Sequence, residues 1–173
     1  MQFRLQFNGL GLGIVCAILG AVESPAAAGE TSLSAAEACA LLDSAEVERV
    51  TGQKMYGEPT PMSLKGGAGA LCGFDNTQVI IFKGKDSERL WNNFLEGFGY
   101  GGVQKHPMPN LGDRAYSFRF VPENKYQDAG TFIVVLNSER TFAVSVSAEE
   151  GEPPQSTEAK AVELAKIVLT KLP

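Results

Sequence analysis

The chain has 173 residues, a net charge of −5 and a hydrophobic fraction of 44%, which suits one globular domain with its own core. The acidic balance and the lack of a basic stripe argue against nucleic acid as a partner. The chain has a single histidine, and two of its three cysteines are expected below to form a disulfide, so the ligands of a zinc site are lacking; the aspartates also lack the spacing of a calcium loop. We therefore expect neither a metal nor a cofactor.

The N-terminus has the three parts of a secretory signal peptide. A start with one basic residue, Arg4, is followed by an uncharged apolar stretch over 9–22 and by small residues up to Ala28. Cleavage after Ala28 would remove residues 1–28 and leave 29–173 as a single exported domain. We therefore expect a periplasmic or extracellular protein.

Two other interpretations of the N-terminus are an uncleaved membrane anchor and a lipoprotein signal. An anchor would need about 20 apolar residues to cross the bilayer. The stretch over 9–22 is shorter, and Cys16 lies within it rather than at its end, where lipidation would require it. We expect no stable membrane anchor after cleavage.

Two cysteines remain after the predicted cleavage, Cys39 and Cys72. An even number in an exported chain indicates a disulfide. Closing that loop would stabilise the fold by roughly 4 kcal/mol in the chain-entropy treatment. Free buried thiols or a redox pair are the alternatives, although the two cysteines do not form a C-x-x-C motif.

Helices and a loop come first in the predicted order. Residues 32–51 predict two short helices, with Ser34 capping the first and Gly52 ending the second. The second helix opens at Asp43. Residues 53–70 are rich in glycine and proline and predict a mobile loop.

Strands dominate the remainder of the chain. A third helix begins at Asp86 with a broad apolar face, and Ser156 would cap a last helix with an apolar stripe. Gly112 and Asp113 predict a turn that starts a strand. The six predicted strands are 71–74, 78–83, 102–108, 114–121, 131–136 and 141–147.

Sequential hairpins predict an α+β fold with an antiparallel sheet of about five to six strands and helices packed on one face. The predicted order of elements is α-α-β-β-α-β-β-β-β-α. Strands 114–121 and 141–147 alternate large apolar with small polar side chains. We therefore expect the second face of the sheet to meet water.

Three patterns suggest chemistry, and each has a structural explanation. Residues 97–102 satisfy G-x-G-x-x-G, but they follow a predicted helix and precede a strand, the reverse of the dinucleotide motif. A Ser-His-acid triad would need His106, and no G-x-S-x-G elbow is present. The acidic residues at 149–152 predict a solvated loop rather than paired catalytic carboxylates. We assign no catalytic residue.

Small polar side chains around one arginine are the candidate ligand contacts. We expect them to lie together on the open face of the sheet, where they could bind an acidic or sugar-like ligand. A simply solvated sheet face is the alternative. The candidates are Ser117, Arg119, Thr141, Ser145 and Ser147.

Five short motifs are informative together. They are Cys39-Ala40-Leu41-Leu42, Ala45-Glu46-Val47, Thr51-Gly52, Cys72-Gly73-Phe74 and Leu111-Gly112-Asp113-Arg114-Ala115. With them the chain resembles, over 36–172, exported bacterial domains of the PsbP-like fold, such as lipoproteins of unknown function and extracellular sensor domains of actinobacterial kinases. The resemblance implies a disulfide between Cys39 and Cys72 and a binding or sensing role, and it implies no catalytic residues. The chain departs from the lipoprotein members because it lacks the lipidation cysteine.

These observations predict a non-catalytic exported module that binds or senses a ligand in the cell envelope. Its partner would be an unknown small ligand or an envelope protein. A structural or protein-interaction role is the first alternative, and an enzyme of unrecognised type is the second.

Overall fold

The computed structural model describes residues 34–64, 69–82, 103–120, 129–138 and 140–172, together with the single positions 89, 92 and 96. Several predicted features lie outside these residues. They are the signal peptide with Cys16, most of the third helix, and the glycine run at 97–102.

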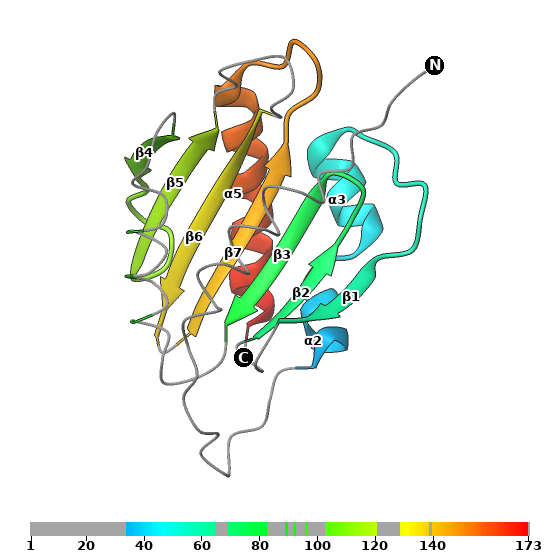
Figure 1. Ribbon diagram of the computed structural model, residues 1–173, viewed down its shortest axis with the longest axis horizontal. Helices are drawn as coiled ribbons and strands as arrows, with labels where there is room; N and C mark the ends of the chain where they lie inside the picture. Colours follow the sequence, from blue (N-terminus) through cyan, green and yellow to red (C-terminus); the bar gives the residue numbers. More distant parts are fainter. Residues whose placement is uncertain are drawn as a thin grey trace.

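Seven strands form one antiparallel sheet in this part of the chain, in the spatial order β1-β2-β3-β7-β6-β5-β4 (Figure 1). The α+β class is therefore confirmed, with more strands than the five to six predicted. The strands are β1 Thr60–Ser63, β2 Gly69–Gly73, β3 Thr77–Phe82, β4 Val103–Pro107, β5 Arg114–Phe120, β6 Gly130–Asn137 and β7 Arg140–Ser147.

The unpredicted strand is β1, which lies in the segment expected to be a mobile loop. Its residues pair with β2 from Thr60 opposite Gly73 to Ser63 opposite Ala70. All four side chains are exposed, so the strand has no alternating apolar pattern. The strand is defined by its backbone hydrogen bonds to β2. Every residue type except proline carries both backbone groups, so these bonds leave no pattern in the sequence.

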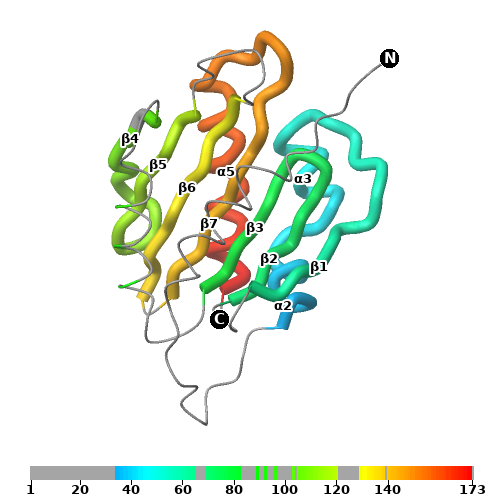
Figure 2. The backbone as a smooth tube through the Cα atoms, viewed as in Figure 1, coloured from blue at the N-terminus to red at the C-terminus, as the bar shows by residue number. Residues whose placement is uncertain are grey.

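In the described part of the chain, three helices with defined bounds lie on one face of the sheet, as predicted (Figure 1). They are α2 Ala35–Cys39, α3 Ser44–Thr51 and α5 Pro154–Lys171. The longest, α5, packs against β6 and β7, and α2 packs against β2 (Figure 2). None of the helices that the structure describes is long and apolar enough to cross a membrane.

The ends of the two short helices follow the predicted signals. Ser34 and Asp43 each form a capping box, with Glu37 and Glu46 respectively. Gly52 ends α3 in the left-handed conformation, with φ of 74°, which glycine adopts without steric cost. The three predicted boundaries, at Ser34, Asp43 and Gly52, are confirmed.

The start of α5 differs from the prediction. Pro153 occupies the N-cap and makes no side-chain capping bond. Ser156 lies inside the first turn and donates to Glu152 Oε1 over 2.7 Å. Lys160 pairs with the same oxygen at 2.7 Å, and the Glu152 side chain is 9% exposed. The acidic loop at 149–152 is thus not solvated throughout, because the Glu152 side chain binds Ser156 and Lys160 in the first turns of α5.

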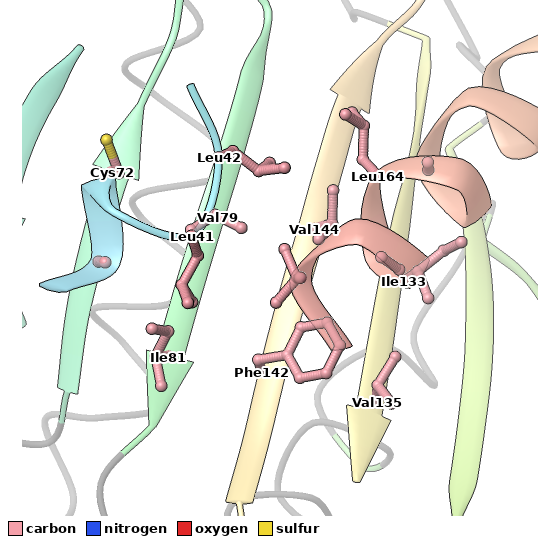
Figure 3. Packing of buried hydrophobic residues seen from close by; sticks show 14 of the residues in the cluster. Leu41, Leu42, Cys72, Val79, Ile81, Ile133, Val135, Phe142, Val144 and Leu164 are labelled. Atoms are coloured by element: carbon pink, nitrogen blue, oxygen red, sulfur yellow. The ribbon is translucent and has the colours of Figure 1, made fainter. Parts of the chain in front are cut away.

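The main core fills the space between the helices and the sheet (Figure 3). Leu41 and Leu42 contribute to it from the segment after α2, and Leu164 contributes from α5. The sheet adds residues of β2, β3, β6 and β7, including Phe142, which is fully buried. Burying a side chain of this size stabilises the fold by about 1.5–3 kcal/mol.

Cys39 of α2 and Cys72 of β2 form a disulfide, with Cα atoms 4.9 Å apart and a sequence separation of 33. The predicted bridge is confirmed. It joins a helix of only five residues to a buried strand of the sheet. Disulfides persist in oxidising compartments, so the bridge is consistent with export.

The second face of the sheet is also buried, which contradicts the expectation of a water-facing surface. Its apolar residues form a separate group, called here the outer cluster, in which Phe82, Phe118 and Val134 are fully buried. The expectation takes the aromatic side of β5 to face the helices. The structure instead places Phe118 of that side in the outer cluster. The outer cluster is Leu71, Ile80, Phe82, Phe118, Phe132, Val134, Leu136 and Ala143.

The turn before β5 is formed as predicted. Gly112 has φ of 64°, and a Cβ there would lie 2.7 Å from Leu136 O and 2.6 Å from Val135 Cγ1. Asp113 accepts a hydrogen bond at Oδ2 from Ser138 N over 2.5 Å. The turn therefore needs glycine for both its conformation and its close approach to β6.

Candidate functional site

Two of the predicted contact residues lie on the helix side of β5. Ser117 and Arg119 alternate with Phe118, which belongs to the outer cluster, so their side chains point toward α5. Ser117 Oγ donates to Glu158 Oε1, and Arg119 Nη2 donates to Glu158 Oε2. The second turn of α5 is thus joined to β5 by one carboxylate that accepts two hydrogen bonds.

Further polar residues surround this pair because of the strand register. His106 of β4 lies opposite Ser117, and Thr131 of β6 lies opposite Arg119. Thr157 precedes Glu158 on α5 and is fully buried. The group His106, Ser117, Arg119, Thr131, Thr157 and Glu158 is called the polar cluster below.

The polar cluster is largely shielded from water. Ser117 is fully buried and Thr131 is 1% exposed, while the side chains of Arg119 and Glu158 are 16% and 14% exposed. Taking two charges this far out of water is costly unless they pair and keep their hydrogen bonds. The Arg119–Glu158 ion pair meets that condition on the Glu158 side, where both carboxylate oxygens accept a bond.

Burial raises the pKa of Glu158, whereas hydrogen bonds from Arg119 and Ser117 lower it. The charge of Arg119 and a smaller effect of His106 act in the same direction. The pKa of Glu158 therefore lies below its ordinary value of 4.5. Glu158 is an ionised acceptor near neutral pH and is not a proton donor.

Four polar atoms of the cluster are buried without a hydrogen-bonding partner in the described part of the chain. They are His106 Nε2, Arg119 Nε, Thr131 Oγ1 and Thr157 Oγ1. Buried polar groups in folded proteins are nearly always paired, and each exception calls for an explanation. Arg119 Nε and the two hydroxyls are able to donate to an acceptor oxygen.

The arrangement does not resemble a nucleophilic site. The Ser117 hydroxyl donates a hydrogen bond to the Glu158 carboxylate rather than to His106, although His106 lies directly opposite on β4. A serine nucleophile needs a general base that accepts its proton and access to substrate. Ser117 has no exposed surface through which a substrate could reach its hydroxyl.

The five predicted contact residues do not lie together. The pairing places Ser117 in one row with Ile133 and Val144, on the helix side. Ser145 lies opposite Phe132, a member of the outer cluster, and alternation puts Thr141 and Ser147 on that same side. The expectation that the five share one face is therefore wrong, because the register of the β6–β7 hairpin points the polar sides of β5 and β7 in opposite directions.

Four residues of the polar cluster were not predicted. The main omission is Glu158, which precedes the buried Ala161 by three residues and so lies at the border of the apolar stripe of α5. That position was the one available signal. Thr131 and Thr157 gave no signal, since threonine is common in strands and near helix starts. His106 was considered only as a member of a triad.

The other sequence patterns add no site. The described residues contain no group of three or more histidine, cysteine or acidic side chains that could hold a metal ion.

Comparison with protein-family models finds no match for the chain, and comparison with curated proteins finds no match either. The resemblance to exported PsbP-like domains stays a prediction.

Proposed function

We propose that this protein is an exported, non-catalytic module that binds a small polar ligand at the polar cluster. The observation that carries the proposal is the set of four buried, unpartnered polar atoms around the Arg119–Glu158 pair. A buried donor without a partner costs about 1–3 kcal/mol. A ligand that satisfies these atoms would recover that free energy on binding.

The chemistry of the unpartnered atoms favours an oxygen-rich ligand, and a carboxylate most of all. Arg119 Nε–H and the hydroxyls of Thr131 and Thr157 can each donate to an oxygen. Arg119 is positively charged, and its Nη2 already donates a hydrogen bond to the Glu158 carboxylate. A small carboxylate at Nε would use the side of the guanidinium that Glu158 leaves unpaired.

Access requires a local movement, because each of the four atoms is closed to solvent. The shortest opening is a separation of the first turns of α5 from β5, where Glu158 is the joining residue. Binding would then be coupled to the stability of this contact. A sensing role follows naturally from such coupling, since occupancy would alter how firmly α5 is held.

The predicted signal peptide and the Cys39–Cys72 disulfide support a periplasmic or extracellular location for this binding. A protein-interaction role is the second candidate.

The test compares Thr131→Val with wild type in the presence of acetate, succinate and citrate at constant ionic strength. Thr131→Val keeps the shape of the side chain and removes one unpartnered hydroxyl, so the variant should fold at least as stably as wild type. We expect a carboxylate to raise the melting temperature of wild type and to raise that of the variant clearly less. Thr60→Val, at an exposed strand position, is the matched control and should respond like wild type.

An equal response of Thr131→Val and wild type would contradict the assignment of the site. A wild-type melting temperature that none of the three carboxylates changes would contradict the ligand class. Isothermal titration of the most effective probe then gives the affinity directly, and the same ranking of the three proteins is expected.

A further inference from the structure

Among the residues that the structure describes, the sheet ends in two edge strands without a further neighbouring strand, β1 and β4. In an antiparallel pair, successive residues direct their backbone N–H and C=O alternately toward the partner strand and away from it. The groups that point away from an edge strand can pair with an added strand. Which residues of β1 and β4 point outward follows from one hydrogen bond in each pair.

At β4, Met108 N donates to Ala115 O over 2.9 Å, so residue 108 directs its backbone inward. The register is continuous from Val103 opposite Phe120 to Pro107 opposite Tyr116. Val103, Lys105 and Pro107 therefore direct their backbone groups outward. Val103 and Lys105 offer both N–H and C=O, and Pro107 offers C=O alone.

At β1, Leu64 N donates to Gly69 O over 3.0 Å, which directs the backbone of Pro61 and Ser63 outward. Proline has no N–H, so Ser63 supplies the single outward donor of this strand. Proline at such a position is a common protection against added strands. The β4 edge is therefore the better template of the two.

The charge at β4 indicates the kind of strand that fits it. Lys105 is exposed, and its ammonium lies 4.3 Å from the centre of the Tyr116 ring. The neighbouring residue, His106, lies on the helix side of the same strand. Two copies paired through β4 would bring Lys105 near its own equivalent, which is unfavourable for like charges. An acidic strand would instead meet a complementary charge.

We propose that the free edge of β4 binds an extended, acidic segment of a partner protein by strand addition. Val103 and Lys105 provide the backbone pairing, and Lys105 selects acidic side chains. The proposal is independent of the ligand at the polar cluster, because the outward backbone groups of β4 take no part in that cluster.

The test uses a fluorescent peptide of the sequence Glu-Val-Glu-Val-Glu-Val and its Lys-Val counterpart, with binding followed by fluorescence anisotropy. The acidic peptide should bind and the basic peptide should not. Lys105→Gln should weaken binding severalfold and reduce its salt dependence. Lys105→Pro also removes an outward N–H and should cost about a further tenfold, the value of one lost hydrogen bond. Ser63→Pro, which removes the outward donor of β1, is the matched control and should bind normally.

Hydrogen exchange in wild type tests the same geometry without a substitution that could disturb folding. The amides of Val103 and Lys105 should become protected when the acidic peptide binds, while that of His106, which already points to β5, should not change. The proposal is refuted if the two peptides bind equally well. It is also refuted if Lys105→Pro, with an unchanged circular dichroism spectrum, binds normally, or if the amides of Val103 and Lys105 gain no protection. A concentration-dependent dimer that Lys105→Pro abolishes would show that the occupant is a second copy, and would also refute it.

Discussion

The Arg119–Glu158 and Arg49–Glu163 pairs both join an arginine to the helix α5, but they differ in exposure. The side chains of the first pair are 16% and 14% exposed, and those of the second are 60% and 52% exposed. Glu158 also accepts from Ser117, while Arg49 and Glu163 share one bond of 2.7 Å. Replacing each glutamate by glutamine therefore makes the same chemical change in two environments.

We expect Glu158→Gln to lower the free energy of unfolding by about 2–3 kcal/mol, less than the 3–5 kcal/mol typical of breaking a fully buried pair, because some solvent reaches both side chains. The variant leaves the Arg119 charge without its partner. Glu163→Gln should cost at most about 0.5 kcal/mol, because water screens the exposed pair. Urea denaturation of both variants, analysed by linear extrapolation, measures the difference.

The pH dependence gives an independent check. The pKa of Glu158 is lowered in the folded protein, so its contribution is present above the carboxyl pKa of the unfolded chain, about 4.3. That contribution is lost as the pH falls through the lower folded pKa. The stability difference between wild type and Glu158→Gln should therefore narrow as the pH falls below about 4. Equal costs for the two glutamine variants at pH 7, or a difference that widens in acid, would refute the role given to Glu158.

Two further predictions concern the scaffold. Gly112→Ala should lower the free energy of unfolding, measured by heat or urea, by about 2–4 kcal/mol, because a positive φ combines with a close backbone contact. Gly52→Ala has a positive φ but nothing within 4 Å of its Cβ, so it should cost about 1–2 kcal/mol. Equal costs for the two variants would argue against the contact at Gly112. Replacing Cys39 and Cys72 together by alanine should lower stability by roughly 2–5 kcal/mol, and peptide mapping without reductant that finds two alkylatable thiols in the native protein would refute the bridge.

Local features of this fold were predictable from the sequence. Ser34 with Glu37 marks a helix start, Gly52 marks a helix end, and Gly112 marks a left-handed turn. Each depends on the chemistry of a few adjacent residues, such as a side chain that caps a free N–H or a missing Cβ. The disulfide was predictable for a similar reason, since only two cysteines follow the predicted cleavage site.

Which side chains face each other was decided by tertiary structure. The alternation in β5 and β7 separates polar from apolar positions, but alternation alone does not say which set faces the helices. The register of the β6–β7 pairing places Ser117 in the same row as Val144, with Ile133 between them, and places Ser145 on the far side. A shift of one residue would have brought the two serines to the same face, as the sequence analysis assumed.

The polar cluster shows the same division between sequence and structure. Its residues come from β4, β5, β6 and α5, and Arg119 and Glu158 are separated by 39 positions in the sequence. The sequence by itself determined the starts of α2 and α3, the end of α3, the strand segments after residue 70 and the pairing of the two cysteines that follow the predicted cleavage site. Only the tertiary structure brought Glu158 to Ser117 and Arg119, because packing of α5 across the sheet depends on the whole core rather than on any local pattern.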